Sequence, residues 1–105
     1  MHALFKGLKV LEFGGGAAGP FGVRYFADHG ATVVRVESRQ RPDFIRLLRF
    51  TPDTPGGIDA SHMFAMVNPN KYGIALNMSH AKGPDPEWRW VGWADVVAEN
   101  IAPKA

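Results

Sequence analysis

Apolar and polar residues follow two different periods in the first part of this chain of 105 residues. Residues 8–13 and 32–37 are short runs rich in strand-forming side chains, and the first run stops at three consecutive glycines. Between them, the apolar side chains of residues 21–27 fall on roughly one helical face, with Pro20 suited to the first turn and Gly30 to a left-handed cap. The pattern predicts a strand–helix–strand unit that closes right-handed onto a parallel sheet.

The period weakens in residues 38–60, where prolines and glycines surround a candidate short helix at 44–50, and it returns at 72–78 and 94–100. Each of these later runs predicts another strand, and Pro84 can open a helix between them. That helix would carry Trp88, Trp90 and Trp93, whose spacing favours packing in the core over an exposed stacking platform. The sequence therefore predicts one domain of the α/β class with a Rossmann-like open parallel sheet.

The composition is that of a globular protein, with 46% hydrophobic and 21% charged residues. The net charge of +2 gives no argument for nucleic acid as a partner. The chain has no cysteine, no apolar run near the roughly 20 residues of a membrane span and no signal-peptide pattern, so we expect a cytoplasmic protein without a membrane partner. One basic cluster could meet phosphates or form a solvated surface. It comprises Arg39, Arg41, Arg46 and Arg49.

The segment from Gly14 to Gly19 has the form G-x-G-x-x-G and lies between the first predicted strand and helix. Such glycines permit a tight turn and let a phosphate approach the N–H groups and the positive dipole of a helix N-terminus. Glu37, at the end of the second strand, could then accept a ribose hydroxyl. This interpretation suggests a site for NAD or S-adenosylmethionine. The alternative is that the small residues only allow the turn to pack closely.

Asn68-Pro69-Asn70-Lys71 forms a second polar group just before a predicted strand. Its two amides and one ammonium could bind carbonyl or phosphate oxygens, or the segment could be an ordinary turn. The four histidines lie far apart, so no metal site is expected. Neither Ser61 nor Ser79 belongs to a nucleophile elbow, and no complete catalytic constellation is present.

Five blocks of sequence, taken in order, resemble the start of a known family. They read GLKVLEF at 7–13, AGPF at 18–21, ADHGATVVRVE at 27–37, NPNKYGIALN at 68–77 and ADVVAENIAP at 94–103. Their order and spacing are similar to those of the class III CoA-transferases, a family that includes formyl-CoA and L-carnitine CoA-transferases and α-methylacyl-CoA racemase. The resemblance covers residues 5–103, apart from the loop at 42–61 and the weakly matching stretch at 80–93.

The resemblance implies that residues 1–105 are the CoA-binding N-terminal part of an enzyme that moves CoA between an acyl-CoA and a carboxylic acid without a metal. For the full-length family it implies a homodimer of interlocked rings. It also implies an aspartate nucleophile downstream of the matching blocks, so the chain is expected to be truncated and inactive alone. Three alternatives stay open: an acyl-CoA racemase of the same family, a Rossmann fragment that binds NAD or S-adenosylmethionine, and a non-catalytic remnant.

The coenzyme A contacts that the resemblance implies follow the ends of the predicted strands, where open α/β sheets bind ligands. Two of them depart from the family pattern, because Ser38 stands where a basic residue is common and Asn77 where an acidic one is usual. The expected contact residues are Ala17, Ala18, Ser38, Arg39, Leu76, Asn77, Met78, Ser79, Asn100, Ile101 and Ala102.

Overall fold

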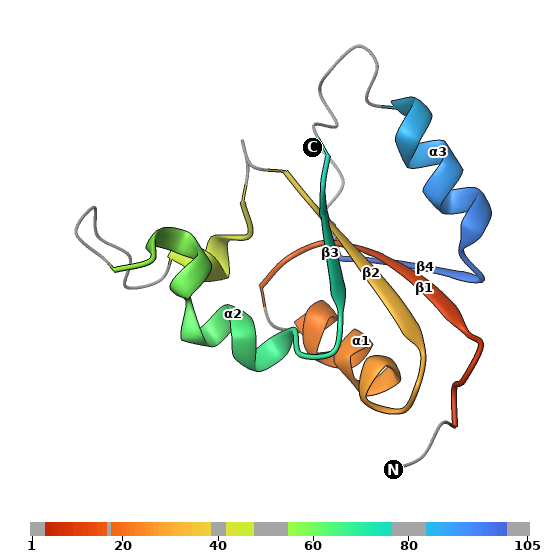
Figure 1. Ribbon diagram of the computed structural model, residues 1–105, viewed down its shortest axis with the longest axis horizontal. Coiled ribbons are helices and arrows are strands. Elements are labelled where there is room, and N and C mark those ends of the chain that lie inside the picture. The colour runs from red at the N-terminus through yellow and green to blue at the C-terminus, as the bar shows by residue number, and fades with distance from the viewer. Residues whose placement is uncertain (1–3, 17, 39–41, 48–54, 77–83, 101–105) are drawn as a thin grey trace.

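A computed structural model describes residues 4–16, 18–38, 42–47, 55–76 and 84–100 of the chain. Four strands form one sheet, in which every neighbouring pair is parallel and the order is β3-β2-β1-β4 (Figure 1). The strands are β1 (Lys9–Phe13), β2 (Thr32–Glu37), β3 (Tyr72–Ala75) and β4 (Val96–Glu99). The helices are α1 (Ala18–Asp28), α2 (His62–Val67) and α3 (Pro84–Trp93), with 3-10 helices η1 (Phe44–Leu47) and η2 (Gly57–Ala60).

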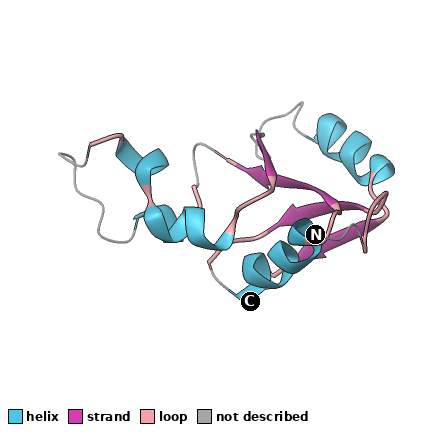
Figure 2. Ribbon diagram, turned by 60° about the horizontal axis from the view of Figure 1, so that its bottom comes forward, coloured by secondary structure: helices cyan, strands magenta, loops and turns pink. Residues whose placement is uncertain are grey.

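Helices cover both faces of the sheet, and Figure 2 shows α1 and α3 on opposite sides of it. On the α1 side, Val10 and Val33 pack against Val23 and Ala27 of the helix. On the other side, a second cluster is centred on Leu11 and includes Trp90 and Trp93 of α3. Because successive strand residues point to alternate faces, a strand buried on both sides needs a nearly continuous apolar run. This requirement explains why residues 9–13 and 32–37 are mostly apolar, with Glu12 and Arg35 as buried exceptions.

The predicted α/β fold with an open parallel sheet is confirmed. The strand–helix–strand unit lies where the pattern placed it, and Gly30 takes the expected positive φ of 104° after α1. Trp90 and Trp93 pack on the Leu11 cluster, edge to face with each other, as predicted for core residues. The short α2 was not predicted, because its six residues span less than two turns and Met63 and Met66 on it are exposed.

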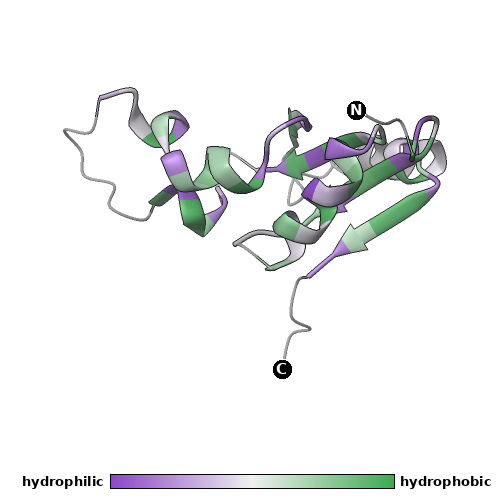
Figure 3. Cartoon of the chain, turned by 90° about the horizontal axis from the view of Figure 1, so that it is seen from below, coloured by the Kyte–Doolittle hydropathy of each residue, from purple (hydrophilic) through white to green (hydrophobic). Residues whose placement is uncertain are grey.

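The strand β4 forms one edge of the sheet and pairs only with β1 among the described strands. Asp95 sets its register, because its backbone N–H donates to the Lys9 carbonyl at 2.8 Å and its Oδ2 accepts from the Lys9 N–H at 3.0 Å. Val96 and Val97 are exposed, and Figure 3 shows β4 green along most of its length, just before the chain reaches the C mark. The register of β4 places Asn100, the residue after the strand, beside the glycines that follow β1.

Candidate functional site

The chain leaves the carboxyl end of β1 at a topological switch point. The next strand along the chain, β2, lies on one side of β1, whereas β4 lies on the other. Open α/β sheets bind ligands outside the carboxyl ends of the strands at such a point. The segment from Gly14 to Gly19, named here the glycine turn, lies there together with Asn100, which directly follows β4.

The carboxamide of Asn100 occupies the β4 side of the glycine turn. Its Oδ1 accepts a hydrogen bond from the Gly15 N–H at 3.1 Å, and its Nδ2 donates to the Gly15 carbonyl at 2.9 Å. A Cβ added at Gly14 would lie 1.9 Å from Asn100 Oδ1, and one at Gly19 would lie 2.9 Å from Asn100 Cγ. A side chain at either glycine would therefore have to displace the Asn100 carboxamide.

The carboxylate of Asp43 occupies the other side of the turn. Its Oδ1 accepts from the Gly16 N–H at 2.9 Å and from the Ile45 N–H at 3.1 Å. A Cβ at Gly15 would lie 2.8 Å from Asp43 Oδ1, and one at Gly16 would lie 2.9 Å from the Phe44 ring. The N–H groups of Gly15 and Gly16 thus already have partners within the protein. The close-packing interpretation of the glycines is the one that the structure supports.

A buried network of charged residues lies behind the turn. Arg35 on β2 pairs with Asp43 Oδ2 and lies 3.5 Å from Oε1 of Glu12, its neighbour in register on β1. The same Glu12 oxygen lies 2.9 Å from Lys71 Nζ. The side chains of Arg35, Glu12 and Lys71 are at most 3% exposed. Burial lowers the pKa of Lys71 below its ordinary value of 10.5, and the hydrogen bond and charge of Glu12 oppose part of that shift.

The polar side chains of the Asn68–Lys71 segment bind other parts of the protein. Lys71 Nζ donates to the Pro20 carbonyl in the first turn of α1 and to Asn68 Oδ1, both at 2.8 Å. Asn70 has a left-handed φ of 64°, and its Nδ2 donates to Asp28 Oδ1 at 2.7 Å. That hydrogen bond is the largest cause of the lowered pKa of Asp28. The turn interpretation of this segment is confirmed, and its amides and ammonium bind protein oxygens.

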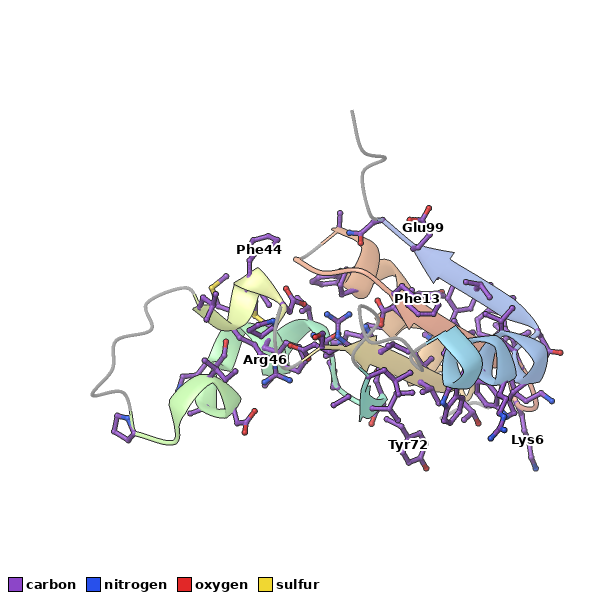
Figure 4. All side chains as sticks on the ribbon, turned by 90° about the horizontal axis from the view of Figure 1, so that it is seen from above. Lys6, Phe13, Phe44, Arg46, Tyr72 and Glu99 are labelled. Atoms are coloured by element: carbon purple, nitrogen blue, oxygen red, sulfur yellow. The ribbon has the colours of Figure 1, made fainter. Side chains whose placement is uncertain are left out.

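The carboxylate of Glu37 is also bound within the protein. Arg46 donates two hydrogen bonds to it, from Nε to Oε2 at 2.8 Å and from Nη2 to Oε1 at 3.1 Å. The Asp43 N–H also donates to Oε2, at 2.8 Å. The guanidinium of Arg46 stacks on the Phe64 ring at 3.5 Å, and Figure 4 shows Phe44 and Arg46 on opposite sides of η1. These contacts leave little capacity at Glu37 for a ribose hydroxyl. Three further members of the basic cluster, Arg39, Arg41 and Arg49, lie outside the described residues.

A cavity of about 540 Å³ lies between β3, α2 and the two 3-10 helices. Polar and apolar side chains both line it, and the charged ones already belong to the ion pairs of Arg35, Arg46 and Lys71. Ser38 and Ala75, at the carboxyl ends of β2 and β3, also belong to its lining. The cavity is therefore continuous with the strand ends on the β3 side of the sheet.

The structure places the described members of the predicted contact set at the carboxyl ends of all four strands. Ala18 begins α1 within the glycine turn, next to Gly19, where an added Cβ would lie 2.9 Å from Asn100 Cγ. Ser38 follows β2, and Leu76 follows β3 with its N–H donating to the Glu37 carbonyl at 3.0 Å. The other predicted contact residues lie outside the described residues: Ala17, Arg39, Asn77, Met78, Ser79, Ile101 and Ala102.

Sequence reasoning missed the part that Asp43, Arg35 and Glu12 play at the turn. A signal was present, because Glu12 and Arg35 are charges set between apolar residues inside their strands, and buried charges are normally paired. Within the described residues there is no cluster of three or more histidine, cysteine, aspartate or glutamate side chains that could hold a metal ion. None of the described helices is long and apolar enough to cross a membrane.

Comparison with known proteins identifies a family to which this chain is similar. A family model described as CoA-transferase family III matches residues 5–105. The formyl-CoA:oxalate CoA-transferases of Escherichia coli O6:H1 and Shigella boydii serotype 18 are each 37% identical over 106 residues, covering 100% of this chain. The chain spans only 24% of the length of either enzyme.

Two solved structures have a fold similar to that of this chain. A CAIB/BAIF family protein from Brucella suis is 31% identical, with a TM-score of 0.78 over 96% of this chain and 26% of that one. A Mycobacterium tuberculosis protein is 26% identical, with a TM-score of 0.69 over 88% of this chain and 24% of the other. The parallel sheet and its flanking helices are therefore an arrangement that these larger proteins share.

Proposed function

Because the chain belongs to CoA-transferase family III, we propose that it forms the CoA-binding part of an enzyme that moves CoA between an acyl-CoA and a carboxylic acid. The proposal is supported by the position of the described residues of the predicted contact set, which all lie beyond the carboxyl ends of the parallel strands. Parallel strands present their carboxyl ends together, so a long ligand such as CoA can touch several of them at once. The residues concerned are Ala18, Ser38, Leu76 and Asn100.

Two contacts argue against a dinucleotide in the same place. The N–H groups of Gly15 and Gly16, which a phosphate would need, are bound by Asn100 and Asp43. The carboxylate of Glu37, which a ribose would need, is held by Arg46. The names of the relatives give formyl-CoA as donor and oxalate as acceptor, and these are the first substrates to test on the whole enzyme.

Isothermal titration of the 105-residue chain with CoA, NAD and S-adenosylmethionine tests the proposal. We expect CoA to bind more tightly than the other two. The contacts with Gly15 use one amide proton and one lone pair of Asn100, so Asn100→Ala should weaken CoA binding by about 2- to 10-fold, as expected for the loss of one further neutral hydrogen bond. Asn70→Gly is the matched control, because it removes an amide away from this edge and glycine tolerates the φ of 64°. Equal affinity for all three ligands, or no binding of any, would reject the proposal.

The chain alone should not transfer CoA. Three of the described aspartates serve structural contacts: Asp43 is buried against Arg35, Asp28 pairs with Arg24, and Asp95 sets the register of β4. A carboxylate nucleophile must instead reach the thioester carbon, with donors around the developing oxyanion. Incubation with formyl-CoA and oxalate should therefore give no oxalyl-CoA, and turnover abolished by changing one of these aspartates would contradict this expectation.

A further inference from the structure

The carboxylate of Asp43 lies where an anionic ligand would meet a glycine turn. It accepts the N–H groups of Gly16 and Ile45 through Oδ1 and pairs with the Arg35 guanidinium through Oδ2. A phosphate at a helix N-terminus uses the same kinds of partner, namely backbone N–H groups and an arginine. The protein's own carboxylate therefore fills an anion-binding position at the start of α1.

Several contacts keep the carboxylate in that position. Its side chain is fully buried, and that of Arg35 is only 3% exposed. Arg35 is oriented in turn by Glu12 on the neighbouring strand, and the Asp43 N–H is held by Glu37. Removing one partner from a buried ion pair leaves an uncompensated charge, so a ligand phosphate cannot readily displace Asp43.

We propose that Asp43 is a specificity-determining residue, which denies the glycine turn to a pyrophosphate and so excludes dinucleotides from this edge of the sheet. The proposal rests on the proposed function, because it concerns which nucleotide ligand the same edge accepts. A second negative charge beside Gly16 would be repelled at short range in a site largely shielded from water. CoA can be accepted there only if its phosphates lie away from the Gly16 N–H.

Removing the carboxylate should convert the position into an anion site. Asp43→Ser frees the Gly16 N–H and the Arg35 guanidinium, while the serine hydroxyl can still cap η1. Asp59→Ser is the matched control, because it removes the same charge from a carboxylate that is 88% exposed and pairs with Arg46. The probe is inorganic pyrophosphate, and the readout is the amide resonance of Gly16 during an NMR titration of the full chain.

We expect Asp43→Ser to bind pyrophosphate at least about ten-fold more tightly than the wild type, the effect of one charge-assisted contact, with a shift at Gly16. The wild type and Asp59→Ser should bind equally weakly and leave Gly16 unmoved. A wild-type shift as large as that of the variant, or no gain in the variant, overturns the proposal. If Asp43→Ser fails to fold, Asp43→Thr decides, since its hydroxyl can also cap η1 while the carboxylate is removed from the Gly16 N–H, and it must still bind more tightly than the wild type.

A CoA titration of the wild type separates this proposal from the proposed function. Absence of CoA binding would reject the proposed function while leaving the comparison of pyrophosphate affinities intact. Conversely, a wild type that binds CoA but also takes pyrophosphate at Gly16 would reject only the role of Asp43.

Discussion

Different kinds of side chain bind the two sides of the glycine turn, a carboxylate on the side of η1 and an amide on the side of β4. On the η1 flank, Asp43 is a buried carboxylate paired with the buried Arg35. On the β4 flank, Asn100 is an exposed neutral amide that pairs with both backbone groups of Gly15. Charges interact more strongly where water is excluded, so the η1 flank behaves as part of the core. The β4 flank is the one that a ligand can reach from solvent.

The sheet itself produces this difference. Arg35 lies on β2, which has a strand on each side, whereas Asn100 follows β4, which forms an edge. A central strand buries the charges it carries and forces them to pair, while an edge strand leaves the residues after it accessible. The following experiments test whether the two flanks differ as much in energy as they do in burial.

Lys71→Met should lower the free energy of unfolding more than any other change, because it removes the positive charge that pairs with buried Glu12. Glu12 would keep only the contact at 3.5 Å with Arg35, and breaking a buried ion pair typically costs about 3–5 kcal/mol. We expect the free energy of unfolding in urea to fall by that amount. Lys6→Met, which removes an exposed ammonium, is the control and should change stability by less than about 0.5 kcal/mol. Equal losses in the two variants would show that the network is not a stabilising unit.

Gly14→Ala should have the next largest effect, on the β4 flank. The new Cβ would meet Asn100 Oδ1 at 1.9 Å in a residue whose φ is +135°, and such strain costs about 1–3 kcal/mol. Gly22→Ala is the control and should change stability in the opposite direction, because no atom lies within 4 Å of its Cβ position in α1. That substitution should stabilise the chain by up to about 1 kcal/mol. Thermal unfolding of both variants compares them directly.

The clash at Gly14 can be separated from backbone strain. Adding Asn100→Gly to Gly14→Ala removes the carboxamide but leaves the unfavourable φ unchanged. We expect the double variant to be more stable than the sum of the two single losses predicts. Strict additivity in the double-mutant cycle would assign the whole effect to φ.

Asn100→Ala should cost little stability by itself. It removes two neutral hydrogen bonds at an exposed position, where water can replace both partners, so the total loss should stay below about 1.5 kcal/mol. Urea denaturation should therefore show a loss well below that of Lys71→Met. A loss of equal size would mean that the exposed amide supports the fold as strongly as the buried charges do, and the contrast between the flanks would fail.

The smallest effect is a dependence of stability on pH that arises from Lys71. Because burial lowers its pKa below 10.5, the unfolded chain binds a proton that the folded chain has lost over the window between the two values. The free energy of unfolding should therefore rise with pH across that window, and below it the contribution should be constant. The stability difference between the wild type and Lys71→Met, measured at several alkaline pH values, should show this rise. A difference that falls with pH would contradict the lowered pKa.

Local pattern was enough to predict β1, α1 and β2, because each is a run whose period matches one element and whose ends carry glycine or proline. It was not enough for α2, whose six residues give no clear period and whose cap is a single bond from the Phe64 N–H to Ser61 Oγ. The strand ends that carry Ser38 and Leu76 were also predictable, since parallel strands direct their carboxyl ends to one edge.

By itself, the sequence determined the α/β class, the family resemblance and the presence of a glycine turn between the first strand and helix. It left two interpretations of that turn, a phosphate site and a close-packed bend, and both satisfy the same local geometry. Only the tertiary structure decided between them, by bringing Asp43 from 27 residues away and Asn100 from 85 residues away onto the turn's N–H groups. The physical reason is that strand order sets which distant side chains reach those donors, and a donor already satisfied within the protein is not free to bind a phosphate.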